Sequence, residues 1–340
     1  MSKRSLRKEE HLLLAKKLFN PNQDSDFNKV HLFRPALPET EVNSTSIQTL
    51  FLNKVVSAPF FVNAMTGGSQ KSFEINKRLA QACAQENIAM SLGSASILEK
   101  EPNQLDSFLI ARQENPNGLL FANVNPNTDP QVAKRIVHEL QADALQIHLN
   151  VLQEIVMPEG DRNFYWLDNM QEIRQQVDVP IIVKEVGAGI PLDSLRTLID
   201  NKFDIIDIGG SGGTNFSQIE NQRRQDSEFS FVDNLGLSTT KCLLSAKKIN
   251  VPKTLIASGG ITDALQIFKA LVLGANYVGI ANLFLQYASM SKESLVERIR
   301  SFKKQLTALC AIFGIDSIDD ASSIKYYLDT DLISFINQLS

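Results

Sequence analysis

Eight short apolar segments alternate with amphipathic helical segments between residues 58 and 285, and this alternation constrains the fold most. Strands that alternate with helices in this way form parallel sheets. Eight such strands predict an α/β fold of the (β/α)8 barrel class, the TIM barrel. The predicted strands are 59–65, 87–93, 119–125, 144–150, 180–186, 204–210, 254–260 and 276–282, with helices at 72–86, 130–140, 192–201 and 262–273.

A doubly wound open sheet is the alternative fold. Such a sheet usually has fewer strands and a Gly-x-Gly-x-x-Gly turn after the first one. The turn after segment 59–65 offers only Gly67 and Gly68, so the barrel is favoured. Residues 1–57 are then an N-terminal extension, 58–291 the barrel, and 292–340 C-terminal helices, within a single domain overall.

The composition argues against several classes of partner. The 340 residues carry a formal net charge of −4, whereas proteins that bind nucleic-acid backbones are usually basic. No segment approaches the roughly 20 uninterrupted apolar residues that cross a membrane. Cys83, Cys242 and Cys310 lack zinc-binding spacing and suit a reducing compartment. We expect a cytoplasmic protein with no nucleic-acid or membrane partner.

Polar residues and glycines gather where the predicted strands end, which is the catalytic face of a barrel. In segment 144–150, Gln146, His148 and Asn150 share one face, and apolar residues share the other. Three inward polar residues are costly as packing alone, so they predict a site. Other strand-end residues of this kind are Met65–Gly68, Gly93–Ser94, Asn123, Lys184, Gly209–Thr214 and Ser258–Gly260.

Two glycine-rich regions are candidates for binding phosphate. Residues 258–261 end the seventh predicted strand, and residues 274–282 contain the eighth. Barrels commonly hold a phosphate here on backbone N–H groups, although glycines also serve tight turns. The loop 209–214 has four glycines and can lie flat on a ligand, with the Thr214 hydroxyl as a donor. A flexible hinge is the alternative for that loop.

Charged residues near the strand ends have both functional and structural interpretations. Lys184 interrupts an apolar strand, and Glu185 has the opposite strand parity. We therefore expect the ammonium group to face the barrel mouth and to stabilise an electron-rich ring there. Glu154 is either a magnesium ligand or an ion-pair partner of Arg162. The Arg7–Lys8 pair suits a diphosphate, but taken alone it is better explained as a solvated tail or helix start.

Together these motifs resemble the flavin-dependent type 2 isopentenyl-diphosphate isomerases, over nearly the whole chain. The most specific motif is HLNxxQExxMPEGDR at 148–162. The others are RKxEH at 7–11, NAMTGG at 63–68, GS at 93–94, VKEVGxG at 183–189, GGxGGT at 209–214 and SGGI at 258–261. The resemblance implies a barrel that binds FMN and interconverts isopentenyl and dimethylallyl diphosphate in isoprenoid biosynthesis. It also implies Mg²⁺, NADPH as the reductant of FMN, and a homo-oligomer, either a tetramer or an octamer.

The resemblance further implies a role for each matched residue. Gln153, at the allylic part of the substrate, and Lys184, beside the flavin, would be catalytic, and Glu154 would bind Mg²⁺. The N-terminal extension 1–57 would carry a substrate-binding arm. The substrate would be bound by Gln153 and by Arg7, Lys8, Ser94, Ala95, Ser96, His148 and Asn150. FMN would be held by Ala64, Met65, Thr66, Ser94, Asn123, Lys184, Gly209, Thr214, Gly259, Gly260, Ala281 and Asn282. The chain departs from the family at Gly209, where serine is common, and at Thr262, where arginine is common.

The implied reaction adds a proton at one end of the allylic system and removes one at the other, with reduced FMN as acid and base and no net redox change. A flavin-dependent 2-hydroxy-acid oxidase would need a histidine base late in the barrel. The four histidines, at 11, 31, 138 and 148, all lie no later than the fourth strand. A nucleotide dehydrogenase would need a cysteine in loop 209–214, which has none. A non-catalytic flavin-binding protein is the alternative from another class.

Overall fold

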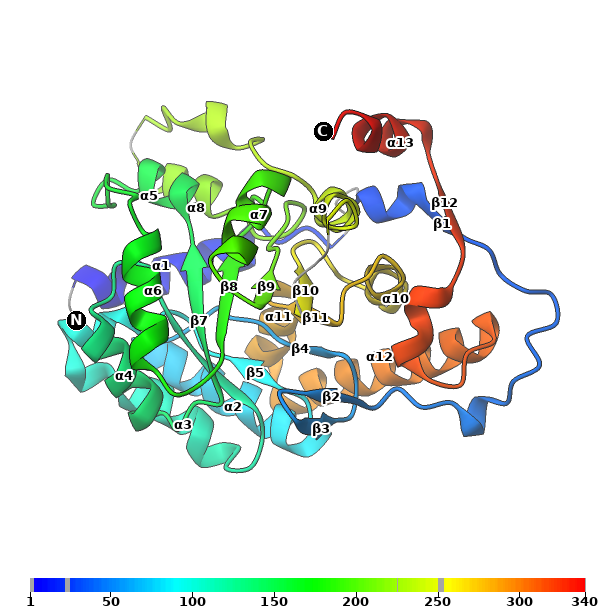
Figure 1. The fold of residues 1–340 in the computed structure, drawn as a ribbon. Coiled ribbons are helices and arrows are strands. Elements are labelled where there is room, and N and C mark those ends of the chain that lie inside the picture. The colour runs from blue at the N-terminus through cyan, green and yellow to red at the C-terminus, as the bar shows by residue number, and fades with distance from the viewer. Residues whose placement is uncertain (1–2, 22–24, 225, 250–253, 340) are drawn as a thin grey trace.

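The computed structural model describes residues 3–21, 25–224, 226–249 and 254–339. Within them, eight parallel strands close into a barrel in chain order, with helices outside (Figure 1). The last barrel strand pairs with the first, with Val278 opposite Phe60, so the sheet has no edge. The predicted fold class is confirmed. The barrel strands are β4 Phe60–Val62, β5 Met90–Ser91, β6 Leu120–Val124, β7 Ala144–Leu149, β8 Ile181–Glu185, β9 Ile205–Asp207, β10 Thr254–Ser258 and β11 Tyr277–Ile280.

Side-chain caps fix where the predicted helices begin. Ser69 accepts the N–H of Ser72 at the start of the second helix, and Asp129 accepts two N–H groups at the start of the fourth. Pro130 then occupies the first turn, where its missing N–H costs nothing. The helices around the barrel are α2 Gln70–Glu86, α3 Asp106–Glu114, α4 Pro130–Glu139, α6 Leu167–Gln176, α7 Leu192–Asp200, α9 Thr239–Ala246, α10 Ala264–Val272 and α11 Asn282–Met290.

Each barrel strand ends one to three residues before its predicted end. Segment 204–210, for example, leaves the ladder after Asp207, and Gly209 already has φ of 47°. That left-handed conformation is open to glycine at little cost. The residues that leave the ladder line the carboxyl end of the barrel instead of pairing with a neighbour.

An aromatic cluster fills the opposite, amino end of the barrel. β2 (Thr49–Phe51) and β3 (Lys54–Val56) form a hairpin that carries Phe51. The Phe51 ring stacks on Tyr277, with centroids 3.8 Å apart, and meets Phe61 and Phe121 edge-on. Because apolar side chains close this end, a ligand reaches the barrel interior from the carboxyl end.

The two terminal regions are joined by strand pairing and by a long helix. β1 (Val30–Leu32) pairs antiparallel with β12 (Tyr326–Leu328). α12 (Lys292–Phe313) packs on α2, where Arg300 and Lys303 bind Glu86. We predicted only helices in 292–340, and this was wrong for β12, whose partner strand lies about 300 residues away. The chain ends with η6 Ile318–Ser323 and α13 Thr330–Asn337.

The first helix, α1 (Lys3–Lys17), packs against α8 (Phe216–Gln222) and α11 at the carboxyl end of the barrel. Leu12 and Ala15 are buried in this contact, and Asn282 donates a hydrogen bond to the Ala15 carbonyl. The Arg7–Lys8 pair is therefore part of a packed helix and not of a solvated tail. Among the described residues, no helix is both long and apolar enough to span a membrane.

Candidate active site

A cavity of about 510 Å³ opens at the carboxyl end of the barrel. This volume falls within the range of small-molecule and cofactor sites. Every predicted site residue except Ala95 lines it. Ala95 is buried behind the wall, where its N–H donates to the Asn123 carbonyl. The structure thus brings together residues that the sequence spreads from Arg7 to Asn282.

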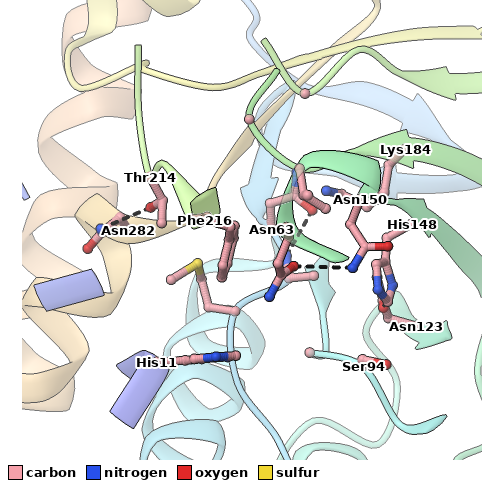
Figure 2. A pocket seen from close by; sticks show the side chains of 18 of the residues that line it. His11, Asn63, Ser94, Asn123, His148, Asn150, Lys184, Thr214, Phe216 and Asn282 are labelled. Carbon is pink, nitrogen blue, oxygen red and sulfur yellow. Dashed lines mark hydrogen bonds between the residues drawn. The ribbon is translucent and has the colours of Figure 1, made fainter. Parts of the chain in front are cut away.

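Glycine loops form one end of the cavity. Gly259 and Gly260 have positive φ angles of 102° and 74°. A Cβ on Gly259 would collide with the Gly210 carbonyl oxygen, so close loop packing by itself requires glycine there. Beside these loops, Asn282 at the start of α11 donates to Thr214 Oγ1 at 3.0 Å (Figure 2). Backbone groups and a hydroxyl therefore border this end, which fits a phosphate.

Lys184, at the end of β8, lies at the other end of the cavity. It is 5% exposed, and its Nζ donates to the Glu185 carbonyl at 2.8 Å. The Glu185 carboxylate turns away and accepts the N–H groups of Gly187, Ala188 and Gly189. Burial raises the pKa of Glu185 to about 7, against the effect of these three hydrogen bonds. Among the described contacts, the Lys184 ammonium group and the Glu185 carboxylate form no ion pair. The opposite strand parity of the two residues predicted this.

A layer of buried polar side chains crosses the barrel interior beside Lys184. Asn63 Nδ2 donates to Asp207 Oδ2 at 2.7 Å, and Gln146 Nε2 donates to Asn63 Oδ1 at 3.2 Å. Asn123 Nδ2 donates to Gln146 Oε1 at 3.0 Å, and Asn123 Oδ1 lies 2.8 Å from His148 Nδ1. Sequence reasoning missed Asn63 and Asp207, although both occupy inward positions of predicted strands.

His148 is held in its neutral form. Burial lowers its pKa to about 3, and the positive charges of Lys184 and Lys8 act in the same direction. A hydrogen bond with the Val124 carbonyl opposes this shift but does not outweigh it. At neutral pH the imidazole is therefore an uncharged member of the cavity wall.

The short helix α5 (Val151–Val156) presents Gln153 and Glu154 to the cavity. Glu154 Oε1 accepts Asn150 Nδ2 at 2.9 Å, and its Oε2 accepts the Asp161 N–H at 2.7 Å. The Arg162 guanidinium instead donates to the backbone carbonyl of Glu154. The alternative of a Glu154–Arg162 carboxylate pair is wrong, because Arg162 is occupied by backbone oxygens.

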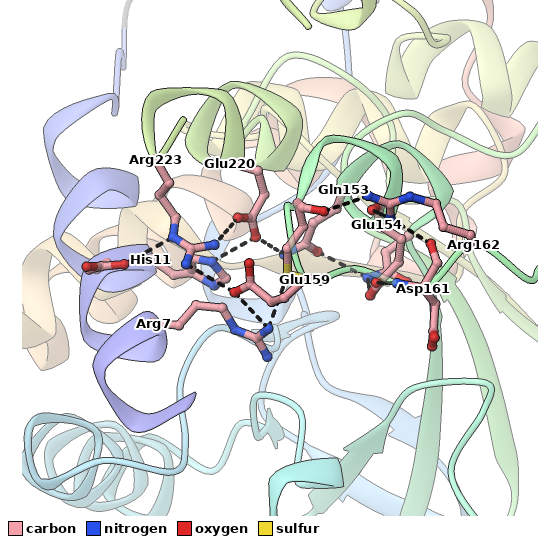
Figure 3. Close-up of polar contacts among 12 residues, drawn as sticks. Arg7, His11, Gln153, Glu154, Glu159, Asp161, Arg162, Glu220 and Arg223 are labelled. Carbon is pink, nitrogen blue, oxygen red and sulfur yellow. Dashed lines mark hydrogen bonds and ion pairs between the residues drawn. The ribbon is translucent and has the colours of Figure 1, made fainter. Parts of the chain in front are cut away.

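Glu220 on α8 is a fully buried carboxylate that the sequence did not reveal. Gln153 Nε2 donates to its Oε1 at 3.0 Å, and His11 Nε2 lies 2.8 Å from the same oxygen (Figure 3). Arg223 donates to its Oε2. Burial alone would raise the pKa of Glu220, but these three partners hold it at about 2. Glu220 is therefore ionised at neutral pH and orients Gln153.

Ion pairs hold α1 across the rim of the cavity (Figure 3). Arg223 contacts Glu10 at 3.0 Å and Glu159 at 3.1 Å, and Glu159 also contacts Arg7 at 3.3 Å. Lys8 Nζ donates to the Ser94 carbonyl at 2.5 Å. The first helix thus places two cations and one histidine over the open end of the barrel.

Comparisons with known proteins agree with this arrangement. The family model of the FMN-dependent dehydrogenases matches residues 107–326. Isopentenyl-diphosphate delta-isomerase from Limosilactobacillus reuteri subsp. reuteri is 40% identical over an alignment of 341 positions, which covers 99% of this chain and 98% of that protein. The isomerase of the same name from Bacillus licheniformis is 42% identical over 333 residues, covering 96% and 94% respectively.

A solved structure shares the fold at much lower identity. Mandelate oxidase with the monooxide FMN adduct superposes with a TM-score of 0.61 at 13% identity, over 94% of this chain and 92% of that one. This likeness shows the barrel architecture alone. The near full-length identity to the isomerases is more specific, and the chain belongs to the isopentenyl-diphosphate delta-isomerase family, of the FMN-dependent type.

Proposed function

We propose that this chain interconverts isopentenyl and dimethylallyl diphosphate in the cavity at the carboxyl end of the barrel, with FMN bound there. The observation that carries this proposal is the pairing of Gln153 with buried, ionised Glu220, in a cavity that buried Lys184 also lines. Perturbed and buried charged groups that converge on one cavity are typical of catalytic sites. The identity to the named isomerases supports the substrate assignment.

The cavity walls fit FMN at both ends. The phosphate would lie on the backbone of Gly259 and Gly260, near Ala281, Asn282 and Thr214. The ring would lie against Ala64, Met65, Thr66, Ser94, Asn123, Lys184 and Gly209. The buried hydroxyl of Thr66 has no hydrogen-bond partner in the described part of the protein, and a bound ring with polar edges would supply one. When bound and reduced, FMN supplies a proton donor and acceptor together with an electron-rich ring.

The substrate diphosphate would lie under α1. Arg7 and Lys8 would neutralise its charge, together with contacts from Ser94, Ala95, Ser96, His148 and Asn150. Lys8 Nζ already lies at the Ser94 carbonyl. Two cations on a packed helix suit a dianionic group better than two cations on a mobile tail, since less side-chain freedom is lost on binding.

Glu154 fits the role of a magnesium ligand supported by the substrate. No cluster of three His, Cys, Asp or Glu side chains that could hold a metal occurs in the described residues. Mg²⁺ is nevertheless often bound by one or two carboxylates plus substrate phosphates. The hydrogen bonds from Asn150 and Asp161 orient the Glu154 carboxylate, as is usual for carboxylates that bind metals.

The residues around the reacting carbons have separate tasks in this proposal. An alkene is a poor base, so its protonation requires a dry site and exact placement. Gln153 donates one N–H to Glu220, and its side-chain oxygen accepts a hydrogen bond from Asn150. Its second N–H is left to orient the allylic part of the substrate. Lys184 would stabilise negative charge on the reduced cofactor. α1 would exclude water and fix the diphosphate, so that remote binding energy serves orientation.

Further properties belong to the same proposal. We propose NADPH as the reductant, because the reaction needs FMN in its two-electron reduced form. We propose a cytoplasmic enzyme, supported by three buried free cysteines. We propose a homo-oligomer, either a tetramer or an octamer. The exposed apolar side chains of Phe33, Leu37, Val42, Leu50 and Val55 support such a contact.

One experiment tests the proposal directly. The purified protein is expected to be yellow with bound FMN and, after anaerobic reduction by NADPH or dithionite, to convert isopentenyl diphosphate to dimethylallyl diphosphate in the presence of Mg²⁺. Bound flavin without isomerisation would instead identify a non-catalytic flavin-binding protein. Loss of conversion on adding EDTA would support the metal assignment.

A further inference from the structure

A chain of side-chain hydrogen bonds leads from the centre of the barrel to His148. It runs from Asp207 on β9 through Asn63 and Gln146 to Asn123 and then to His148. Figure 2 labels Asn63, Asn123 and His148, which border the cavity. The exposed fractions are 0% for Asp207 and Gln146, 2% for Asn123 and 3% for Asn63. Asp207 and Gln146 are closed off from water, and Asn63 and Asn123 only border the cavity, so the donors and acceptors between these groups are satisfied by their neighbours. Such a chain has a defined direction.

The backbone fixes that direction at one end. The Ala64 N–H donates to Asn63 Oδ1 at 2.8 Å, and a backbone N–H is only a donor. Asn63 must therefore turn its Nδ2 toward Asp207. The Asp207 carboxylate accepts this N–H on one oxygen and the Ser258 hydroxyl on the other. The orientation of Asn63 thus has two independent anchors.

The remaining amides follow from Asn63. Its Oδ1 can only accept, so Gln146 must approach it with Nε2, and Gln146 Oε1 is left to accept. Ser91 Oγ and Asn123 Nδ2 both donate to that oxygen. Asn123 then presents Oδ1 to His148, and an amide oxygen is only an acceptor. The ring proton of neutral His148 must therefore be on Nδ1.

We propose that Gln146 is a positioning residue that holds His148 in its Nδ1–H tautomer, which leaves Nε2 as a hydrogen-bond acceptor toward the cavity. The low pKa of His148 is consistent with one ring proton and not two. An acceptor does not bind an anionic diphosphate oxygen directly. His148 therefore meets the diphosphate through a shared donor, such as the Lys8 ammonium group, whose charge acts on the His148 ring. Only this last step rests on the proposed function.

Nitrogen-15 NMR of the histidine rings in the purified, full-length protein tests the tautomer itself. Protonated and unprotonated ring nitrogens have well separated shifts, and the His148→Gln variant identifies the signals of His148 among the four histidines. We expect a protonated Nδ1 and an unprotonated Nε2, with no titration between about pH 5 and pH 8. A proton on Nε2, or an imidazolium in this range, would overturn the proposal.

Two substitutions test the role of Gln146. Gln146→Met removes the links to Asn63, Asn123 and Ser91 with little change in volume. We expect a mixture of His148 tautomers and a loss in kcat/KM of roughly tenfold to a hundredfold. Gln146→Glu is the matched rescue variant. Burial keeps the introduced carboxyl protonated, so its O–H donates to Asn63 and its carbonyl accepts from Asn123. We expect the Nδ1–H tautomer to persist in this variant, because the carboxyl accepts from Asn123 Nδ2 whether or not it is protonated, and Asn123 Oδ1 then still faces His148.

The outcomes separate this proposal from the proposed function. Unchanged ring signals in Gln146→Met would show that Gln146 does not set the tautomer. If Gln146→Met does not fold, Gln146→Glu decides the question, and a mixture of His148 tautomers in this variant rejects the proposal. Gln175→Met, at an exposed position on α6, is the control and should change neither signals nor rate. The Nδ1–H tautomer in a protein that lacks isomerase activity would reject the proposed function while leaving this one standing.

Discussion

Gln153 on α5 and Glu220 on α8 share a hydrogen bond of 3.0 Å between Nε2 and Oε1 at the rim of the cavity (Figure 3). Glu220 is ionised and can only accept, so it fixes which way the Gln153 amide points. Asn150 completes the arrangement by donating to Gln153 Oε1 at 3.2 Å. Because both its amide nitrogen and its amide oxygen are hydrogen-bonded, the Gln153 side chain has little rotational freedom and can orient a substrate beside it.

Removal of the Gln153 amide should therefore impair catalysis and not cofactor binding. We expect Gln153→Ala to reduce turnover by roughly a hundredfold or more, while the flavin absorbance of the purified protein stays unchanged. Gln175→Ala, at an exposed position on α6, is the control and should retain full turnover. Normal turnover in Gln153→Ala would reject the role assigned to Gln153.

The Glu220 network should make folding stability depend on pH in the acid range. The pKa of Glu220 is about 2 in the folded protein against 4.5 for an ordinary glutamate. Between these two pH values, Glu220 is protonated to a greater extent in the unfolded chain than in the folded protein. The stabilisation is thus complete above about pH 4.5 and is lost as pH falls toward 2. Urea unfolding of Glu220→Gln should show a flatter pH dependence over this range, and an unchanged slope would contradict the assignment.

The same substitution should also lower stability at neutral pH. Glu220→Gln leaves His11 and Arg223 facing a neutral amide in a buried site, and breaking a buried ion pair costs about 3 kcal/mol or more. Glu228→Gln, in an exposed ion pair with Arg224, is the matched control, since exposed pairs contribute at most about 1 kcal/mol.

The fold could be predicted from the sequence because barrel strands and helices are local patterns. Strand period, strand length and capping residues are all visible within a few positions. The elements that were missed depend on distant partners. Tyr326–Leu328 forms a strand only because Val30–Leu32 lies beside it, and Phe51 closes the barrel only because the hairpin returns beneath Tyr277.

The residues of the candidate site likewise divide into those that local sequence patterns predict and those that only tertiary packing brings together. Asn123, His148 and Lys184 were predictable, because strand parity and position determine which side chains face the barrel mouth. Glu220 was not, since it lies on a helix beyond a glycine loop and its partner His11 is 209 residues away along the chain. No periodic signal places a helix across a cavity. Only the packing of α1 on α8 brings these two residues together.

Magnesium dependence should respond to the charge of Glu154. Glu154→Gln keeps an oxygen for the Asp161 N–H but removes the negative charge, so the contact with the main chain is retained while the affinity for a cation falls. We expect the Mg²⁺ concentration for half-maximal rate to rise roughly tenfold or more. The exposed Glu172→Gln on α6 should leave it unchanged. An unaltered Mg²⁺ requirement in Glu154→Gln would exclude Glu154 as a ligand.

The charge of Lys184 should tune the bound flavin. Lys184→Met keeps most of the length of the side chain but removes a buried cation, and an anionic reduced ring next to it would lose stabilisation. We expect a more negative reduction potential of the bound FMN and slower turnover, whereas Lys184→Arg should preserve the potential better than Met does. A potential that is equal in all three proteins would place Lys184 away from the ring.

Arg7 should affect the binding of substrate and not of FMN. Its guanidinium group contacts the Glu159 carboxylate at 3.3 Å on the rim. When substrate binds, this guanidinium group has to pair with the diphosphate instead. A hydrogen bond to a charged group contributes about 1.5–3 kcal/mol, so Arg7→Ala should raise KM roughly tenfold to a hundredfold at unchanged flavin content. Arg34→Ala, at an exposed position of the N-terminal extension, is the matched control. A normal KM in Arg7→Ala would mean that the diphosphate does not lie under α1.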